Sequence, residues 1–96
     1  MYKIKTTSEF IKWLSKIKDS FFRVQLNQRI SRIKQGNFGL NKRLSENIFE
    51  LKFSSAKGYR VYYIIENDVL LLFGGVKDTQ SKDIKFVKQL LKKYQE

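Results

Sequence analysis

The chain has 96 residues, a size that favours one domain, 1–96, with one modest hydrophobic core. It contains no Cys and no His, which excludes disulfides and thiolate zinc sites and removes the usual general base near neutral pH. Twenty Lys and Arg against nine Asp and Glu give a net charge of +11, so we expect an anionic partner and favour nucleic acid over an acidic protein segment, a membrane surface or a simply soluble basic domain.

No segment has the pattern of a membrane span or a secretion signal. The longest apolar run, 69–73, is far shorter than the roughly 20 residues that a bilayer requires. The first residues, MYKIKTT, lack the apolar region of a signal peptide. We therefore expect a cytoplasmic protein, with no membrane partner, no cofactor and no metal site.

The hydrophobic pattern predicts a short strand and two helices in the first half of the chain. Residues 1–6 alternate apolar and Lys side chains, as in an edge strand with its lysines facing water. Thr6 begins a capping-box pattern before an amphipathic helix over 7–18. A second helix is expected over 20–35, ended by Gly36 in the left-handed conformation.

The second half has the pattern of three strands and a helix. The strands are expected over 48–53, 59–66 and 69–73, with a hairpin turn at 67–68. The last helix is expected over 80–95. The order β-α-α-β-β-β-α predicts an α+β fold whose strands form an antiparallel sheet, with the helices packed on one face.

The expected strand 59–66 has two chemically different faces. Its side chains alternate, so Tyr59 and Tyr63 fall on a core face and Arg60 and Tyr62 on the other. A guanidinium is suited to bidentate contact with phosphate, and a phenol ring is suited to stacking on a base. The second face is therefore a candidate anion-binding surface.

Other charged residues are expected to join this face. Glu50 and Lys52 alternate onto it from the neighbouring strand, Lys57 lies in the connecting loop, and Lys77 follows the last strand. Each residue also has an ordinary interpretation. The lysines can simply be solvated, and Arg60 can be paired with a carboxylate, either Glu50 or Glu66. Together, in a chain of charge +11, they favour a concave basic site for RNA or DNA.

Several segments carry a resemblance to a known family. The stretch NIFELKFSSAKGYRVYYII, followed by LLLFGGVKDTQSKDIKFV, resembles the RelE/ParE superfamily of bacterial toxins, and specifically the HigB-type addiction-module killer proteins. The family pattern is Glu-Leu-Arg, a loop ending in Gly-Tyr-Arg-Val-Tyr-Tyr, and Gly-Gly-Asp-Lys-Ser-Thr-Gln before the last helix. The segments EFIKWLSKIKD and RISRIKQGNFG are similar to the family's two helices, so the resemblance covers nearly the whole chain.

The resemblance implies a RelE-like toxin that cleaves mRNA, usually on the ribosome, and is neutralised by a cognate helix-turn-helix, HigA-like antitoxin in a hetero-oligomer. By position, Arg60 matches the motif arginine, Lys77 the basic residue after the last strand, and Lys52 a position where the family usually has Arg. Gln80 and Asp83 match motif positions of less certain role.

The sequence departs from the family pattern at the last turn. Val76 replaces the motif's Asp, Asp78 replaces its Ser, and the loop SSAKG lacks the usual Gly-Pro. Asp78 places a negative charge beside Lys77, which opposes phosphate binding there. The departures bear on the geometry and activity of the site more than on the family.

An endoribonuclease of this kind would act by attack of a 2′-hydroxyl on the adjacent phosphate. We expect Arg60 to clamp the phosphate as its charge grows, and Lys77 to assist it or the leaving group. Lys52 is the candidate general base, with Glu50 as the alternative. Much of the rate would come from the ribosome positioning the mRNA.

Further candidates would bind the substrate rather than react. Tyr59 or Tyr62 would stack on a base. The basic or polar candidates in the loop and helices are Lys57, Gln80, Arg29, Arg32 and Lys85.

Two other functions stay open at this point. A ParE-like toxin of the same fold would poison DNA gyrase and would not require a basic nuclease site. A non-catalytic RNA-binding module would bind RNA with a steep salt dependence and leave it intact. The positions of Lys52, Arg60 and Lys77 favour RNA cleavage over gyrase inhibition.

Overall fold

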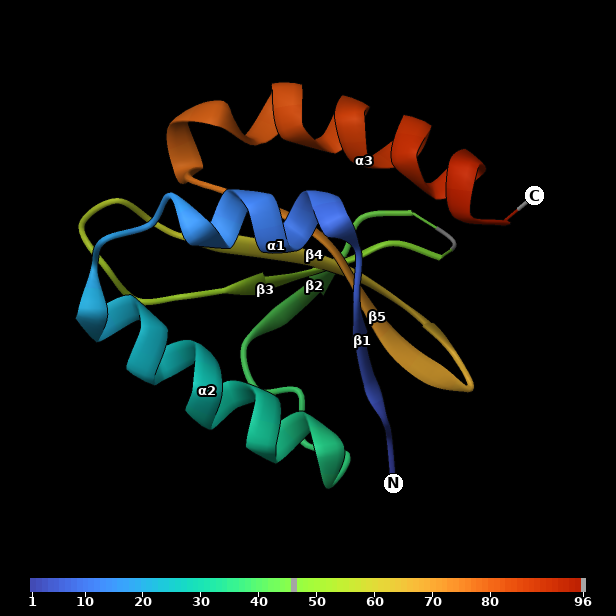
Figure 1. Cartoon of the computed structure of the whole chain (residues 1–96), viewed down its shortest axis with the longest axis horizontal. Coiled ribbons are helices and arrows are strands. Elements are labelled where there is room, and N and C mark those ends of the chain that lie inside the picture. The colour runs from blue at the N-terminus through green and yellow to red at the C-terminus, as the bar shows by residue number, and fades with distance from the viewer. Residues whose placement is uncertain (46, 96) are drawn as a thin grey trace.

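Over residues 1–45 and 47–95, which the computed structural model describes, the chain forms a five-stranded sheet and three α-helices (Figure 1). This α+β arrangement agrees with the predicted fold class. The elements, in chain order, are β1 (Ile4–Thr6), α1 (Ser8–Ser15), α2 (Ser20–Lys34), β2 (Asn41–Arg43), β3 (Phe49–Lys52), β4 (Arg60–Glu66), β5 (Asp68–Gly75), a 3₁₀ turn (Lys77–Thr79) and α3 (Gln80–Gln95). None of the helices within the described ranges is both long and apolar enough to cross a lipid bilayer.

The sheet is mixed, with the strand order β1-β5-β4-β3-β2. The pairs β2–β3, β3–β4 and β4–β5 are antiparallel, as predicted for consecutive strands. β1 instead runs parallel to β5, with Ile4 opposite Val69 and Thr6 opposite Leu71. The prediction of a wholly antiparallel sheet is therefore wrong at this edge, because α1 and α2 separate β1 from its partner and no hairpin dictates its direction.

The strand β2 was not predicted, so the observed order is β-α-α-β-β-β-β-α. Its three residues, Asn-Lys-Arg, are all polar and exposed. They carry no alternation of apolar and polar side chains, which is the signal that identifies a strand in sequence. Backbone pairing to β3, with Asn41 opposite Leu51 and Arg43 opposite Phe49, defines the strand.

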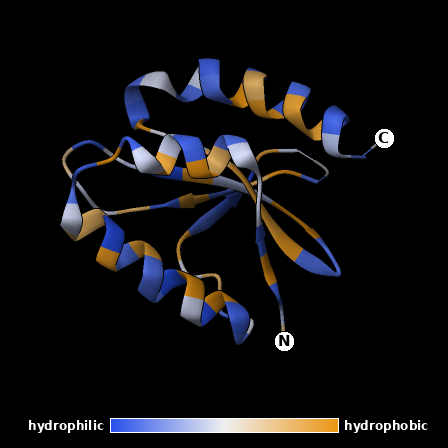
Figure 2. Ribbon diagram, viewed as in Figure 1, coloured by the Kyte–Doolittle hydropathy of each residue, from blue (hydrophilic) through white to orange (hydrophobic). Residues whose placement is uncertain are grey.

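Helices cover both faces of the sheet, so the prediction that all helices pack on one face is wrong. α1 and α2 bury one cluster against the sheet, and α3 buries a second cluster against the opposite face. Figure 1 shows α3 and α2 on opposite sides of the strands, and Figure 2 shows hydrophobic and hydrophilic segments alternating along α3, as expected for a helix with one buried side. The buried helical side chains are Phe10, Phe22, Leu26 and Ile33 on the first face and Val87 and Leu90 on the second.

A bulge in β5 lets both clusters use the same strand. Tyr62 of β4 pairs with Phe73 and Tyr63 with Leu71, so Leu72 is an extra residue on β5. Leu71 packs in the α1/α2 cluster, whereas Leu72 and Phe73 both pack in the α3 cluster. This explains why the run Val-Leu-Leu-Leu-Phe is apolar throughout instead of alternating.

The first helix begins one residue later than predicted. The Thr7 hydroxyl accepts a hydrogen bond from the Phe10 amide at 2.9 Å and donates one to the Leu72 carbonyl at 2.6 Å. Thr7 therefore caps α1 and fastens it to β5 at once. Thr6, the predicted cap, is still paired within β1.

The two N-terminal helices end for different reasons. α1 stops at Ser15, short of the predicted residue 18, because the Arg23 guanidinium binds the carbonyls of Leu14 and Ile17. α2 ends at Lys34, one residue before the predicted end, and Gly36 terminates it as predicted, with a φ of 91° in the left-handed region.

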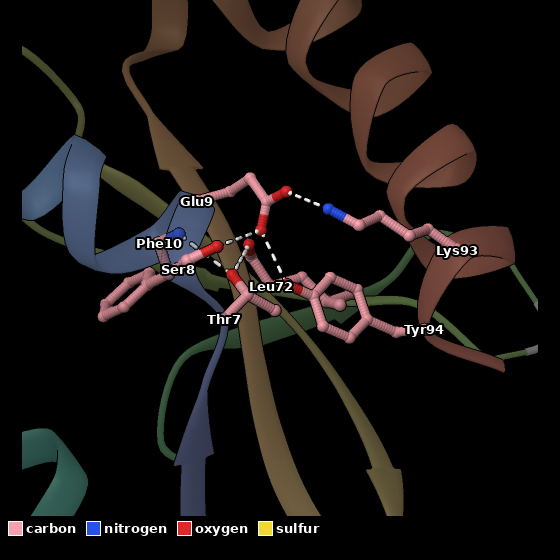
Figure 3. A network of polar contacts seen from close by, with 7 residues as sticks. All are labelled: Thr7, Ser8, Glu9, Phe10, Leu72, Lys93 and Tyr94. Carbon is pink, nitrogen blue, oxygen red and sulfur yellow. Dashed lines mark hydrogen bonds and ion pairs between the residues drawn. The ribbon is translucent and has the colours of Figure 1, made fainter.

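A polar latch joins the start of α1 to the end of α3, although more than 80 residues separate the two in sequence. The Glu9 carboxylate accepts hydrogen bonds from Lys93 Nζ at 3.0 Å and from the Tyr94 hydroxyl at 2.8 Å (Figure 3). These contacts, the Lys93 ammonium first, lower the pKa of Glu9 from 4.5 to about 2. The latch holds α3 at its last turn, beyond the residues that its apolar side buries.

The paired glycines of β5 allow close packing on both faces. A Cβ at Gly74 would overlap the Trp13 ring, and a Cβ at Gly75 would overlap the Asp83 carboxylate. Neither position has room for a side chain, so the Gly-Gly motif sets the distance of α1 and α3 from the sheet.

We predict that Gly74→Ala displaces the Trp13 ring and lowers the free energy of unfolding by about 1–3 kcal/mol, the range typical of overpacking. Urea unfolding followed by the fluorescence of Trp13, the single tryptophan, measures both effects. Gly36→Ala is the control: its Cβ meets no atom within 4 Å, so it strains a turn without moving the Trp13 emission. Native emission and native stability in Gly74→Ala would contradict the packing described.

We predict that Glu9→Gln lowers stability at neutral pH and that its deficit relative to the wild type shrinks as the pH falls from 4.5 to about 2. The sign follows because a carboxylate with a depressed folded-state pKa stabilises the protein above its unfolded-state pKa and loses this effect as it becomes protonated. Urea unfolding at a series of pH values measures the difference. Asp78→Asn, which neutralises an exposed carboxylate, should not reproduce it.

Candidate nucleic-acid interface

The predicted face of β3 and β4 exists in the structure. The register places Lys52 opposite Arg60 and Glu50 opposite Tyr62, so the four side chains share one face as expected. This face is the one that α3 covers, however, and Glu50 and Tyr62 are both 0% exposed. The prediction of an open concave surface holding a phenol is therefore wrong where α3 packs.

Arg60 is paired rather than free. Its Nη1 lies 3.7 Å from Glu50 Oε1, and its side chain is 12% exposed. The other Glu50 oxygen accepts a hydrogen bond of 2.7 Å from Gln80 Nε2. Arg60 Nε is buried without a hydrogen-bond partner among the residues described, so the pair does not use all of the guanidinium.

The Glu50 carboxylate cannot act as an exposed general base in this conformation. It is fully buried and is held between Arg60 and Gln80. The arrangement favours a positioning role, in which Glu50 orients Arg60 and ties α3 to the sheet through Gln80. Gln80 was predicted to bind substrate, and its amide is instead committed to Glu50.

The two tyrosines predicted to stack on a base are buried, so that prediction is wrong for this conformation. Tyr59 is 3% exposed and its ring stacks on Phe22 with 4.2 Å between centroids. Tyr62 packs under α3, where burial, and then the charge of Glu50, raise its pKa. The sequence alone did not reveal the burial of Tyr62, because alternation places it on one face of the sheet but does not show that α3 covers that face.

Exposed cations gather around the β3–β4 loop instead. Lys57 and Lys77 are exposed, and the Lys77 amide donates a hydrogen bond of 3.3 Å to the Lys57 carbonyl. Gly58 permits this approach: its φ is +64°, and a Cβ there would lie 2.9 Å from the Lys77 Cβ. The Gly of the Lys-Gly-Tyr-Arg motif is thus explained by the contact between these two segments.

The turn between α1 and α2 lies against the same loop. Residues 16–19 and 55–57, with Tyr59, line a hollow of about 490 Å³, which adds Lys16 and Lys18 to this end of the molecule. Sequence reasoning missed these two lysines, because only tertiary packing brings them to the loop. We call the resulting group the basic end; its cations are Lys16, Lys18, Lys52, Lys57, Arg60 and Lys77.

The other predicted contact residues are not gathered with Arg60. Arg29 donates to the carbonyls of Lys52 at 2.8 Å, Leu40 at 2.9 Å and Phe38 at 3.1 Å, so it ties α2 to the β2–β3 edge. Arg32 is exposed on α2, and Lys85 is exposed on α3.

Asp83, a motif position without an assigned role, is structural. Its carboxylate is 8% exposed, accepts a hydrogen bond from the Thr79 hydroxyl and packs on Gly75. Burial raises the pKa of Asp83. The motif Gly-Gly-Val-Lys-Asp-Thr-Gln-Ser-Lys-Asp is therefore explained by the turn from β5 into α3.

The basic end can bind anions but offers few groups for proton transfer. Within 1–45 and 47–95, no three Asp, Glu, His or Cys side chains come together in a way that would hold a metal ion. With Glu50 buried, Lys52, Lys57 and Lys77 are the candidate groups of the basic end that combine proximity to Arg60 with solvent access.

The chain is 49% identical over 89 residues to a protein of Haemophilus influenzae (strain ATCC 51907 / DSM 11121 / KW20 / Rd) whose only description is "Uncharacterized protein". The match covers 91% of this chain and 90% of that protein. The chain therefore belongs to the same family as the Haemophilus protein. No family model matches the sequence, and no solved structure matches it.

We predict that Arg60→Leu lowers the free energy of unfolding by about 3–5 kcal/mol, because it leaves the buried Glu50 charge without its cation. Urea unfolding measures the loss. Lys57→Leu, which removes an exposed cation, should stay within about 0.5 kcal/mol of the wild type.

A double variant sharpens this test. Arg60→Leu combined with Glu50→Leu should recover part of the loss, since neither charge is then buried alone. A single Arg60→Leu variant as stable as the wild type would show that the pair does not act as described.

Proposed function

We propose that the protein is a RelE-like, HigB-type toxin of the bacterial cytoplasm, an endoribonuclease that cleaves mRNA, with the ribosome positioning the substrate. The observation that carries the proposal is that Lys52 pairs with Arg60 across β3 and β4, while the Lys57 and Lys77 backbones are hydrogen-bonded at the same end of the sheet, which bears the Gly-Tyr-Arg motif. The net charge of +11 supports an RNA target through the phosphate backbone.

The proposed roles differ from those that the sequence alone suggested. Half-buried Lys52 and exposed Lys77 would contact the scissile phosphate and stabilise its growing negative charge, and one of them would also take part in proton transfer. Arg60, oriented by Glu50 and largely buried, would contribute its positive charge behind the two lysines. Neither buried tyrosine is assigned to base stacking.

The ribosome would supply what the basic end lacks. A site without His, in which the carboxylate paired with Arg60 is buried, has little capacity for proton transfer of its own. Positioning the attacking 2′-hydroxyl in line with the phosphate reduces the demand on acid–base chemistry. On the resemblance alone, we further propose a cognate HigA-like antitoxin as the second partner.

A non-catalytic RNA-binding module is the second candidate, and one observation favours it. Arg60 is 12% exposed and paired with Glu50, whereas a catalytic phosphate clamp would be expected to face solvent. Such a module would use the same lysines to bind RNA and would leave the strand intact.

We predict that the double variant Lys52→Ala/Lys77→Ala lowers mRNA cleavage by about 100-fold or more and relieves growth arrest, because it removes charge stabilisation at the phosphate. Primer extension on cellular mRNA after brief induction measures cleavage, and circular dichroism verifies folding. The matched control is Lys3→Ala/Lys92→Ala, which removes the same charge from exposed residues at the opposite end of the sheet and of α3.

The outcomes separate the two candidates. Full cleavage by the Lys52/Lys77 variant would refute the assignment of the site. Wild-type protein that binds RNA with steep salt dependence but leaves it intact, with or without ribosomes, would favour the non-catalytic module over the toxin.

A further inference from the structure

A second basic hollow lies on the other side of the sheet from α3. Its volume is about 150 Å³, enough for a group of several heavy atoms, since one water occupies about 30 Å³ in the liquid. It opens between α2 and the edge of β3. Its lining residues are Gln25, Gln28, Arg29, Arg32, Leu40, Lys52, Phe53 and Ser54.

The lining combines cations with amides and contains no acidic side chain in the part of the chain described. Arg29 forms a fixed positive wall, because three backbone carbonyls and the Phe53 ring, 4.8 Å from its guanidinium carbon, hold it in place. Arg32 lies one turn further along α2 and is exposed. The amides of Gln25 and Gln28 can donate hydrogen bonds into the same space.

The cations of this hollow repel one another in the absence of an anion. Burial, and then the charge of Arg32, lower the pKa of Arg29. A bound anion would relieve the repulsion between the two arginines, and phosphate matches the guanidinium geometry. Because the Nη groups of Arg29 already donate to backbone carbonyls, Arg29 would attract the anion through its charge, and Arg32 would donate to it.

Lys52 connects the hollow to the basic end. Its backbone lines the hollow, where its carbonyl accepts from Arg29, whereas its side chain shares the α3 face with Arg60, its partner across β3 and β4. Its backbone is fixed on both sides, because its amide donates to Leu40 and its carbonyl accepts from Arg29. A single-stranded RNA with one phosphate at the basic end could therefore reach around the end of β3 and place a neighbouring phosphate in the hollow.

We propose that the hollow formed by Gln25, Gln28 and Arg32 against Arg29, beside the Lys52 backbone, binds a backbone phosphate of the same RNA strand that the basic end engages. This inference rests on the proposed function in taking RNA as the ligand, and it assigns Gln25 and Gln28 as contact residues. The site binds through the phosphodiester group and reads no base.

A matched pair of variants on the last turn of α2 tests the proposal. Arg32→Ala should weaken binding of a fluorescein-labelled single-stranded RNA 12-mer about 10-fold and reduce the slope of log affinity against log salt by about one. Lys34→Ala removes the same charge from an exposed residue that does not line the hollow, and should change affinity by less than about threefold. Gln28→Ala should weaken binding without changing the slope.

Inorganic phosphate provides an independent probe. In the wild type, phosphate should shift the side-chain amide NMR signals of Gln25 and Gln28 saturably, and in Arg32→Ala it should not. Equal losses of RNA affinity in Arg32→Ala and Lys34→Ala would overturn the proposal. Saturable binding of phosphate with RNA affinity unchanged in Arg32→Ala would overturn it too, leaving a site for the free ion only.

The binding assays also distinguish failure of this inference from failure of the proposed function. If the wild-type protein binds RNA through Arg32 and Gln28 but never cleaves it, the proposed nuclease function is refuted and the proposed phosphate site is retained. If the Arg32→Ala and Gln28→Ala variants cleave mRNA normally and bind RNA with unchanged affinity, the proposed phosphate site is refuted and the nuclease function is retained.

Discussion

The buried carboxylate of Glu50 is the constraint around which the candidate site is organised. A fully buried charge requires nearby cations and hydrogen-bond donors; here Arg60 lies 3.7 Å from Oε1, which has no hydrogen bond among the residues described, and Gln80 donates to Oε2. Because Arg60 belongs to β4 and Gln80 begins α3, the contacts of Glu50 also fix the start of α3 over the sheet. The position of α3 and the orientation of Arg60 are therefore set together.

Much of the fold follows from the sequence, because the relevant signals are local. Alternation in 59–66 and helical spacing in 80–95 gave the right elements, and Gly36 marked the end of α2. The strand β2 and the direction of β1 were beyond this reasoning, since backbone pairing between distant segments decides both. The face on which α3 packs was also missed, because an apolar side chain such as Tyr62 shows that a face is buried but not by which helix.

The sequence predicted which residues share the face of the candidate site better than it predicted which of them are exposed to solvent. The alternation rule correctly placed Lys52, Glu50, Arg60 and Tyr62 on one face. It could not show which of them solvent reaches, because α3 meets this face only in the folded chain. Lys16 and Lys18 reach the basic end through the turn between α1 and α2. Arg29 and Arg32 look alike in the sequence, but the Arg29 guanidinium donates its hydrogen bonds to backbone carbonyls.

The outer edge of the sheet has a consequence for association between copies of the chain. β2 pairs with β3 on one side and is the last strand in the sheet order, so its other side is a potential template for an additional strand. Its exposed Lys42 would meet the Lys42 of a second copy if two molecules joined there edge to edge in antiparallel register. Like charges directly opposite are unfavourable, so this edge resists self-polymerisation while still being compatible with an acidic strand from a different protein.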